Sequence, residues 1–207
     1  MKVDQILITG ASGHVGSLLV RALLPEGRKL KLLLNAQDAR QFERKRSALE
    51  QSLLISGLTE RDLASLTYVG GDLSYHCAFD EVEGTSISTI VHLASQTKFN
   101  QSKEVAENVN IGGTERVLDF ARRCPNLENI ILVSSIYASG LKEGEVEEHP
   151  LCATDFGNHY EWSKWQTEQM LVERYSSLPW QIVRLATVIA RQRSPGAALA
   201  CSSVTSK

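Results

Sequence analysis

The chain has 207 residues, of which 43% are hydrophobic and 22% charged, and its formal net charge at pH 7 is -2. These values are typical of one soluble globular domain with a core of ordinary size. Positive and negative side chains are mixed along the sequence, so the composition indicates neither a basic surface for nucleic acid nor a polybasic segment for a membrane.

The four cysteines lie far apart, at positions 77, 124, 152 and 201, without a C-x-x-C pair. This spacing gives no support to a zinc ribbon or a thioredoxin-like motif, and it is typical of a reducing compartment. The histidines at 14 and 92 have no partner at ligand spacing, so no metal site is expected. The N-terminus runs directly into a strand pattern, and no apolar run approaches the ~20 residues of a membrane helix. We therefore expect a cytoplasmic protein without a signal peptide or membrane segment.

Short, continuously apolar runs recur along the chain and are predicted to be buried strands. In chain order they cover residues 5–9, 30–34, 67–69, 89–93, 129–133 and 181–185. Helices are predicted between them, over residues 15–23, 38–54, 102–123 and 160–175. This alternation predicts an α/β fold, a doubly wound and mostly parallel sheet with helices on both faces, in three α/β/α layers.

The loop T-G-A-S-G-H-V-G, residues 9–16, joins the first predicted strand to the first predicted helix. Its first glycine permits a sharp turn, the second lets the backbone approach a pyrophosphate, and the third lets the helix pack on the strand. The helix N-terminus offers free N–H groups and a partial positive charge to phosphates. This context predicts a dinucleotide-binding loop of a Rossmann fold. The expected cofactor contacts in the loop are Thr9, Gly10, Ser12, Gly13, His14, Val15 and Gly16.

The end of the sequence has a different character from this domain. Residues 191–196 are polar and turn-like, and residues 197–207 are mostly small, without a strong period. We expect one NAD(P)-binding Rossmann domain over residues 1–190, followed by an irregular C-terminal tail over residues 191–207.

Five further motifs follow the glycine loop. They are G-D-L at 71–73, H-L-A-S at 92–95, N-I-G-G-T at 110–114, S-S at 134–135 and Y-E-W-S-K at 160–164. Together with the T-G-x-x-G-x-x-G loop, this series resembles the extended type of the short-chain dehydrogenase/reductase superfamily. The resemblance implies that Asp72 contacts the adenine ring and that the 92–95 turn lies beside the cofactor. Further cofactor contacts are expected at Leu73, Leu93, Ala94, Ser95, Val133, Leu185 and Val188.

Tyr160 and Lys164 are four residues apart, so on a helix they share one face. An ammonium beside a phenol favours the phenolate and lowers the phenol pKa from ~10. The tyrosine can then exchange a proton with a substrate oxygen near neutral pH. The resemblance adds that Lys164 also holds the nicotinamide ribose.

The resemblance assigns two more residues to this site. The reactive serine of the superfamily lies five positions before a glycine, which here is Gly140. That spacing selects Ser135 to bind the reacting carbonyl oxygen, with Ser134 as the alternative. Asn110, in the N-x-x-G-T motif, is expected to help place Lys164.

Three segments, residues 91–100, 158–171 and 178–184, resemble the thioester reductase and fatty acyl-CoA reductase branch, with its male-sterility-type NAD-binding domain. That branch uses NADPH to reduce an activated acyl thioester to an aldehyde or alcohol. The resemblance implies an NAD(P)-dependent oxidoreductase that acts on a small molecule, an acyl thioester or another carbonyl compound. A homo-oligomer is compatible with the sequence.

The sequence departs from the branch at two strand ends. The arginine that meets the 2′-phosphate of NADPH is replaced by Asn35, whereas Asp38 is a candidate for the ribose hydroxyls of NAD and Arg40 for a phosphate. On balance we expect NADP (NADPH) to be favoured over NAD. After the sixth predicted strand, Leu185 replaces a proline, and Ala190 stands near the position of an expected glycine.

The sequence also ends where the branch continues, so a C-terminal substrate domain is expected to be missing. Two other interpretations remain open. The first is a nucleotide-sugar epimerase or dehydratase of the same superfamily, which shares the glycine loop and the Y-x-x-x-K motif. The second is a truncated NAD(P)-binding protein without catalysis, because function resides in a site and not in a fold.

Overall fold

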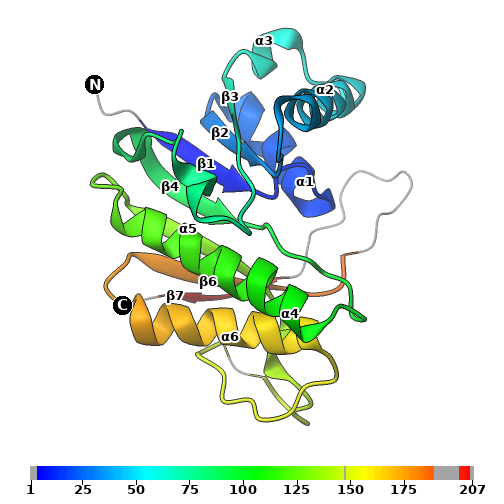
Figure 1. Ribbon diagram of the computed structural model, residues 1–207, viewed down its shortest axis with the longest axis vertical. Helices are drawn as coiled ribbons and strands as arrows, with labels where there is room; N and C mark the ends of the chain where they lie inside the picture. The colour runs from blue at the N-terminus through cyan, green and yellow to red at the C-terminus, as the bar shows by residue number, and fades with distance from the viewer. Residues whose placement is uncertain (1–3, 147, 189–200, 206–207) are drawn as a thin grey trace.

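The computed structural model describes residues 4–146 and 148–188 and, by their backbone, 201–205. Within these residues, seven strands form one sheet in the order β3-β2-β1-β4-β5-β6-β7 (Figure 1). The strands are β1 (Gln5–Thr9), β2 (Lys29–Leu34), β3 (Leu66–Gly70), β4 (Ile87–His92), β5 (Asn129–Ser135), β6 (Trp180–Leu185) and β7 (Cys201–Thr205). The first six strands are parallel, and β7 pairs antiparallel with β6.

Helices connect the strands, as the alternating pattern predicts. The α-helices are α1 (His14–Leu23), α2 (Ala39–Ile55), α3 (Glu60–Leu63), α4 (Lys103–Val105), α5 (Gly113–Arg122) and α6 (His159–Arg174). The short 3-10 segments are η1 (Leu24–Glu26), η2 (His76–Phe79), η3 (Gly84–Ser86) and η5 (Ile136–Ser139).

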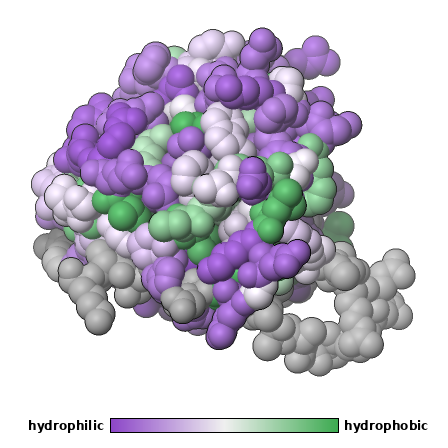
Figure 2. Space-filling view, turned by 90° about the horizontal axis from the view of Figure 1, so that it is seen from below, coloured by the Kyte–Doolittle hydropathy of each residue, from purple (hydrophilic) through white to green (hydrophobic). Residues whose placement is uncertain are grey.

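The sheet separates two apolar cores. Along β1, Leu7 packs in the core that contains residues of α5 and α6, whereas Ile6 and Ile8 pack in the core that contains residues of α1 and α2. This alternation follows from the two-residue period of a strand, and it confirms the predicted three-layer, doubly wound fold. The face seen in Figure 2 is mostly hydrophilic, with small apolar areas between the polar side chains.

The strand order places a topological switch point between β1 and β4, where the chain turns to opposite sides of the sheet. The carboxyl ends of these two strands meet there, because Thr9 pairs with His92. The N–H of Leu93 continues the ladder by donating to the Thr9 carbonyl at 3.2 Å. Ligands of open α/β sheets bind in the crevice at such a point.

The tail predicted over residues 191–207 is not irregular throughout, because Cys201–Thr205 form β7. The backbones of β6 and β7 pair with Ile182 opposite Val204. Without β7, strand β6 would present a row of unpaired backbone N–H and C=O groups. The pairing of β7 satisfies these backbone groups, and the side-chain pattern of the tail does not reveal it. The prediction was therefore wrong for residues 201–205, whereas Ala190, residues 191–200 and residues 206–207 lie outside the described residues.

The single helix predicted over residues 102–123 consists of α4, a π-helical segment η4 (Ala106–Gly112) and α5. Hydrogen bonds in a π-helix span five residues, a change of winding that apolar spacing does not reveal. Such segments are frequent at functional sites. Asn110 lies inside η4, and its side chain is buried.

Candidate active site

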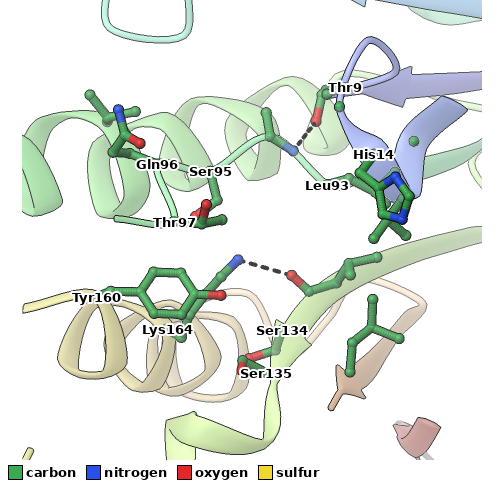
Figure 3. A pocket seen from close by; sticks show the side chains of 18 of the residues that line it. Thr9, His14, Leu93, Ser95, Gln96, Thr97, Ser134, Ser135, Tyr160 and Lys164 are labelled. Carbon is green, nitrogen blue, oxygen red and sulfur yellow. Dashed lines mark hydrogen bonds between the residues drawn. The ribbon is translucent and has the colours of Figure 1, made fainter. Parts of the chain in front are cut away.

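A cleft of about 680 Å³ lies at the carboxyl ends of the parallel strands, between the glycine loop and α6 (Figure 3). Its volume is that of a small-molecule site. Most residues predicted from the sequence line it: Thr9, Gly10, Ser12, Gly13, His14, Val15, Gly16, Asn35, Asp72, Leu73, Leu93, Ala94, Ser95, Val133, Ser135, Tyr160, Lys164, Leu185 and Val188. Arg40 and Asn110 are not among the lining residues. Sequence reasoning missed other lining residues: Leu33, Gly71, Ser74, Gln96, Thr97, Phe99, Val109, Tyr137, Ala186 and Thr187.

The glycine loop forms one wall of the cleft. Gly10 has a φ of 74°, and a Cβ there would lie 2.7 Å from the backbone nitrogen of Ala94. A Cβ on Gly16 would overlap the carbonyl oxygen of Gly10. Helix α1 begins directly after Gly13, which has no side chain that could cap the helix. The N–H groups of the first turn of α1 are therefore available to an anion such as a phosphate.

Tyr160 and Lys164 project from α6 side by side, and Ser135 lies nearby at the end of β5 (Figure 3). The Lys164 ammonium donates from Nζ to the Val133 carbonyl at 3.0 Å. The Ser135 hydroxyl accepts the N–H of Tyr137 at 3.3 Å. Strand β5 and helix α6 thus bring together the three side chains that the motifs single out.

The electrostatics of this group differ from the expectation. Burial raises the pKa of Tyr160, a hydrogen bond with Ser135 opposes the rise, and the Tyr137 phenol adds to it. Burial also lowers the pKa of Lys164 to about 8. The prediction that Lys164 lowers the pKa of Tyr160 is wrong for this structure, because burial dominates at the phenol.

Asn110 lies behind the cleft and reaches two segments that line it. Its Oδ1 accepts the N–H of Gln96 at 2.7 Å, and its Nδ2 donates to the Gln96 carbonyl at 3.0 Å. Nδ2 also donates to Ser163 Oγ on α6 at 2.8 Å. Asn110 is therefore tied to the residue next to Lys164, and no hydrogen bond to Lys164 itself is found among the described contacts.

The α2 end of the cleft holds the residues expected to select the cofactor. Lys45 Nζ donates to the Asn35 carbonyl at 2.5 Å, which places its charge beside a residue that lines the cleft. Asp38 caps α2, because its Oδ1 accepts the N–H of Gln41 at 2.7 Å. Arg40, in the first turn of α2, is exposed and does not line the cleft. The basic group bonded to Asn35 is thus Lys45, a member of the cluster Arg40, Arg44, Lys45 and Arg46, for which the sequence leaves a solvated helix face and a phosphate contact as the two interpretations.

Asp72 links this end of the cleft to the strand ends. Its Oδ1 accepts the N–H of Ser74 at 2.9 Å, and its Oδ2 accepts a hydrogen bond from Gln37 Nε2 at 3.2 Å. Burial pushes the pKa of Asp72 upward, but these hydrogen bonds outweigh it and hold the pKa below its ordinary value. Asp72 is therefore an ionised hydrogen-bond acceptor at neutral pH.

Aromatic side chains form the outer wall beside Tyr160. The ring of Phe99 lies 5.8 Å from that of Tyr160 and 5.8 Å from that of Tyr137, between ring centroids. Phe99 is 53% exposed although it lines the cleft. Tyr137 in turn shares a hydrogen bond with Thr187 at 2.9 Å between their hydroxyl oxygens. The segment containing Phe99 carried the branch resemblance, but no periodicity pointed to this wall.

Two features are absent from the residues that the structure describes. Among the described residues, no group of three or more His, Cys, Asp or Glu side chains is arranged to hold a metal ion. None of the helices in the described ranges has the length and apolar character required to cross a bilayer.

The sequence matches the family described as male sterility protein over residues 8–205. The chain belongs to this family. Relatives include the alcohol-forming fatty acyl-CoA reductase of Simmondsia chinensis, which is 31% identical over 70% of this chain and 33% of that protein. Another is the N-acetyl-alpha-D-glucosaminyl-diphospho-ditrans,octacis-undecaprenol 4-epimerase of Escherichia coli O157:H7, 31% identical over 93% of this chain and 51% of that protein.

Solved structures support the fold of the family member independently. The terminal R domain from the myxalamid PKS-NRPS biosynthetic pathway superposes with a TM-score of 0.76 at 24% identity, over 90% of this chain and 49% of that chain. Family and fold together confirm the resemblance to extended short-chain dehydrogenases/reductases. The chain spans from 27% to 51% of the length of the curated relatives compared.

Proposed function

We propose that this chain carries the cofactor-binding and catalytic half of an NAD(P)H-dependent reductase of acyl thioesters or other carbonyl compounds. The observation that carries the proposal is the convergence of Ser135, Tyr160 and Lys164 in a cleft whose other wall is the glycine loop. Membership of the male sterility protein family supports it, as does the likeness to a protein named as a fatty acyl-CoA reductase.

The residues present fit a dinucleotide in two ways. A side chain at Gly10 or Gly16 would clash with backbone, so the loop keeps the close approach that a pyrophosphate needs. In addition, the buried hydroxyls of Ser95 and Ser134 line the cleft without a partner among the described residues. Buried polar groups rarely stay unpaired, so both are suited to a bound ligand. We assign the pyrophosphate to the glycine loop and the adenine ring to Asp72.

The chemistry divides between the cofactor and the protein. A bound NAD(P)H supplies the hydride that such a reduction requires. Tyr160, whose raised pKa keeps the phenol protonated at neutral pH, donates its proton to the substrate oxygen. Ser135 holds that oxygen by a hydrogen bond. Lys164, charged at pH 7 with a pKa of about 8, holds the nicotinamide ribose.

A preference for NADPH over NADH is proposed from the α2 end. Lys45 places a positive charge beside Asn35, where the 2′-phosphate of NADPH is expected. The single carboxylate that the sequence offered to the ribose hydroxyls, Asp38, is engaged in capping α2. The Lys45 cation, which also faces the Asp72 carboxylate, favours the ligand with the additional phosphate.

The substrate proposed for this site has an apolar group next to its carbonyl. The exposed ring of Phe99, with Tyr137 beside it, forms an aromatic surface at the edge of Tyr160. Such a surface binds an alkyl chain through area burial and offers little to a strongly hydrated sugar. An acyl thioester with an aliphatic chain fits this description.

A nucleotide-sugar epimerase is the second candidate, because one relative with that activity in its name covers 93% of this chain. The two candidates differ in how the cofactor is handled. An epimerase regenerates its cofactor in each turnover and is expected to copurify with bound NAD. A reductase exchanges its cofactor and is expected to be purified without it.

The decisive experiment follows NADPH consumption by the chain with a long-chain acyl-CoA and with the corresponding aldehyde. Tyr160→Phe is expected to lower turnover by about 10²- to 10⁴-fold, the contribution of a general acid. Tyr75→Phe, at an exposed tyrosine outside the cleft, is the matched control. An unchanged rate in Tyr160→Phe would rule out the proposed proton donor. Saturable NADPH binding without turnover would favour the non-catalytic interpretation.

A further inference from the structure

A chain of buried polar side chains runs beneath the cleft, from β1 to α5. Thr9, His92 and Thr114 have exposed fractions of 0%, 3% and 3%. Thr9 Oγ1 lies 2.7 Å from His92 Nδ1, and His92 Nε2 lies 3.0 Å from Thr114 Oγ1. His92 does not line the cleft, and the proposed mechanism makes no use of its ring.

The direction of every hydrogen bond in this chain follows from its neighbours. Thr114 has one hydroxyl proton, which it donates to the Asn110 carbonyl at 2.7 Å, so its oxygen must accept from His92 Nε2. The imidazole therefore carries its proton on Nε2, and Nδ1 is free to accept the hydroxyl proton of Thr9. The Thr9 oxygen in turn accepts the N–H of Ala94 at 3.2 Å, a contact drawn in Figure 3.

This arrangement requires a neutral ring. An imidazolium also carries a proton on Nδ1, and that nitrogen could then no longer accept the hydroxyl proton of Thr9. Burial, followed by the nearby charge of Lys164, lowers the pKa of His92 to about 3. The ring thus keeps the single-proton form over the whole physiological range, so it is suited to a fixed structural connection and not to proton transfer.

The two ends of this hydrogen-bond chain lie at the two parts of the site that must be aligned. Thr9 directly precedes Gly10 of the glycine loop. At the other end, Asn110 holds Gln96 in the cleft wall and Ser163 on α6, next to Lys164. The hydrogen-bond chain therefore joins the wall proposed to bind the pyrophosphate to the helix proposed to carry the catalytic lysine.

We propose that His92 is a positioning residue that fixes the glycine loop relative to α6 through the directed chain Thr9 to His92 to Thr114 to the Asn110 carbonyl. The catalytic meaning of this alignment rests on the proposed function. The hydrogen-bond chain itself does not, and each half can be broken separately.

The test uses two substitutions that each preserve one ring nitrogen. In His92→Asn, the carboxamide oxygen takes the place of Nδ1 and keeps the bond from Thr9, whereas the bond to Thr114 is lost. In His92→Gln, the carboxamide nitrogen takes the place of Nε2 and keeps the bond to Thr114, whereas the bond from Thr9 is lost. His92→Leu breaks both halves and serves as the reference for complete loss.

Two backbone amides report the two halves by hydrogen exchange in the 207-residue chain. The N–H of Ala94 is held by Thr9, and that of Gln96 is held by Asn110. His92→Asn is expected to accelerate exchange at Gln96 by about tenfold or more with little change at Ala94, and His92→Gln to show the reverse. If both variants accelerate the two amides equally, or neither amide changes, His92 contributes only packing and the proposal is overturned.

Binding and turnover provide the functional arms of the same experiment. His92→Gln is expected to weaken NADPH binding by about tenfold, because it releases the glycine loop, and His92→Asn to lower kcat by about tenfold at nearly unchanged NADPH affinity. If wild-type turnover is absent or survives Tyr160→Phe, the proposed function fails. The exchange pattern of the two amides still tests the hydrogen-bond chain through His92 in that case.

Two further measurements keep the proposal testable should the His92 variants fail to fold. Thr114→Val removes the hydroxyl at constant shape and is expected to accelerate exchange at Gln96, while Thr114→Ser keeps the hydroxyl and is expected to restore protection. In the wild-type chain, nitrogen-15 NMR is expected to find His92 protonated on Nε2 alone. Protonation of Nδ1, or equal protection in the two Thr114 variants, would overturn the assignment.

Discussion

At the α6 end of the cleft, polar side chains are buried and held on several sides, whereas at the α2 end they are exposed and rest on a few contacts. Lys164 and Asn110 are 7% and 2% exposed, and Asn110 makes three hydrogen bonds to Gln96 and Ser163. Lys45 and Gln37, in contrast, lie outside the cleft and make exposed hydrogen bonds to Asn35 and Asp72, which line it. Buried, hydrogen-bonded groups have fewer alternative arrangements than exposed ones, so the reaction geometry is specified more tightly than cofactor selection.

The largest effect is expected from breaking the ion pair that fastens α6 to β6. Arg184 and Glu168 are 1% and 0% exposed by their side chains, and their closest approach is 2.7 Å. Glu168→Ala leaves the guanidinium buried without this partner and is expected to lower the free energy of unfolding by about 3–5 kcal/mol. Glu173→Ala, at an exposed position of the same helix, is the control, with a change expected within about 0.5 kcal/mol. Equal losses in the two variants by denaturant unfolding would contradict the distinction.

A pH-dependent effect of somewhat smaller size is expected from Lys164. Its pKa falls from 10.5 to about 8 in the folded chain because of burial. Between these values the unfolded chain binds more protons, so the free energy of unfolding rises with pH, and the cost of burying the charge is complete below pH 8. Lys164→Met is expected to stabilise the fold by on the order of 3 kcal/mol at pH 7, and the gain should vanish above about pH 10.5.

The matched control for this measurement is Lys142→Met, at an exposed lysine outside the cleft. Denaturant unfolding of the two variants at several pH values between 7 and 10.5 separates the cases. A Lys164→Met gain that does not change over this range would show that the ammonium carries no burial cost.

The proposed cofactor selection at the α2 end is tested by comparing two cations of the same helix. Lys45→Ala is expected to weaken NADPH binding by about fivefold to tenfold and NADH binding scarcely, because an exposed cation–phosphate contact contributes about 1 kcal/mol. Arg40→Ala, at an exposed residue that does not line the cleft, should change neither affinity by more than about twofold. Fluorescence titration with both cofactors checks the pair, and a larger loss in Arg40→Ala would restore Arg40 as the phosphate ligand.

The smallest effect is expected from Asp38, which the structure places as the cap of α2. Asp38→Ala removes an N-cap and is expected to lower the free energy of unfolding by about 1 kcal/mol. Asp38→Asn keeps an acceptor oxygen and should retain most of this stability. NADH affinity is expected to be unchanged in both variants, and a clear loss of NADH binding would assign Asp38 to the ribose after all.

Much of the fold and of the cleft could be predicted because the signals were local. The glycine loop, the strand ends and the Tyr160–Lys164 pair each depend on a few neighbouring residues whose conformation the sequence dictates. Predictions that depended on distant partners were less successful. The electrostatics at Tyr160 followed burial and not its helical neighbour, and the cation near Asn35 came from the second turn of α2 and not from its start.

The sequence by itself determined the alternation of strands and helices, the family, and many of the residues that line the cleft. Only the tertiary structure decided the π-helical turn around Asn110, the antiparallel pairing of β7, the aromatic wall of Phe99 and the direction of the hydrogen-bond chain through His92. The reason is physical. Periodicity records which face of an element is buried, whereas hydrogen-bond direction, strand pairing and pKa depend on groups that the fold brings together from far apart in the chain.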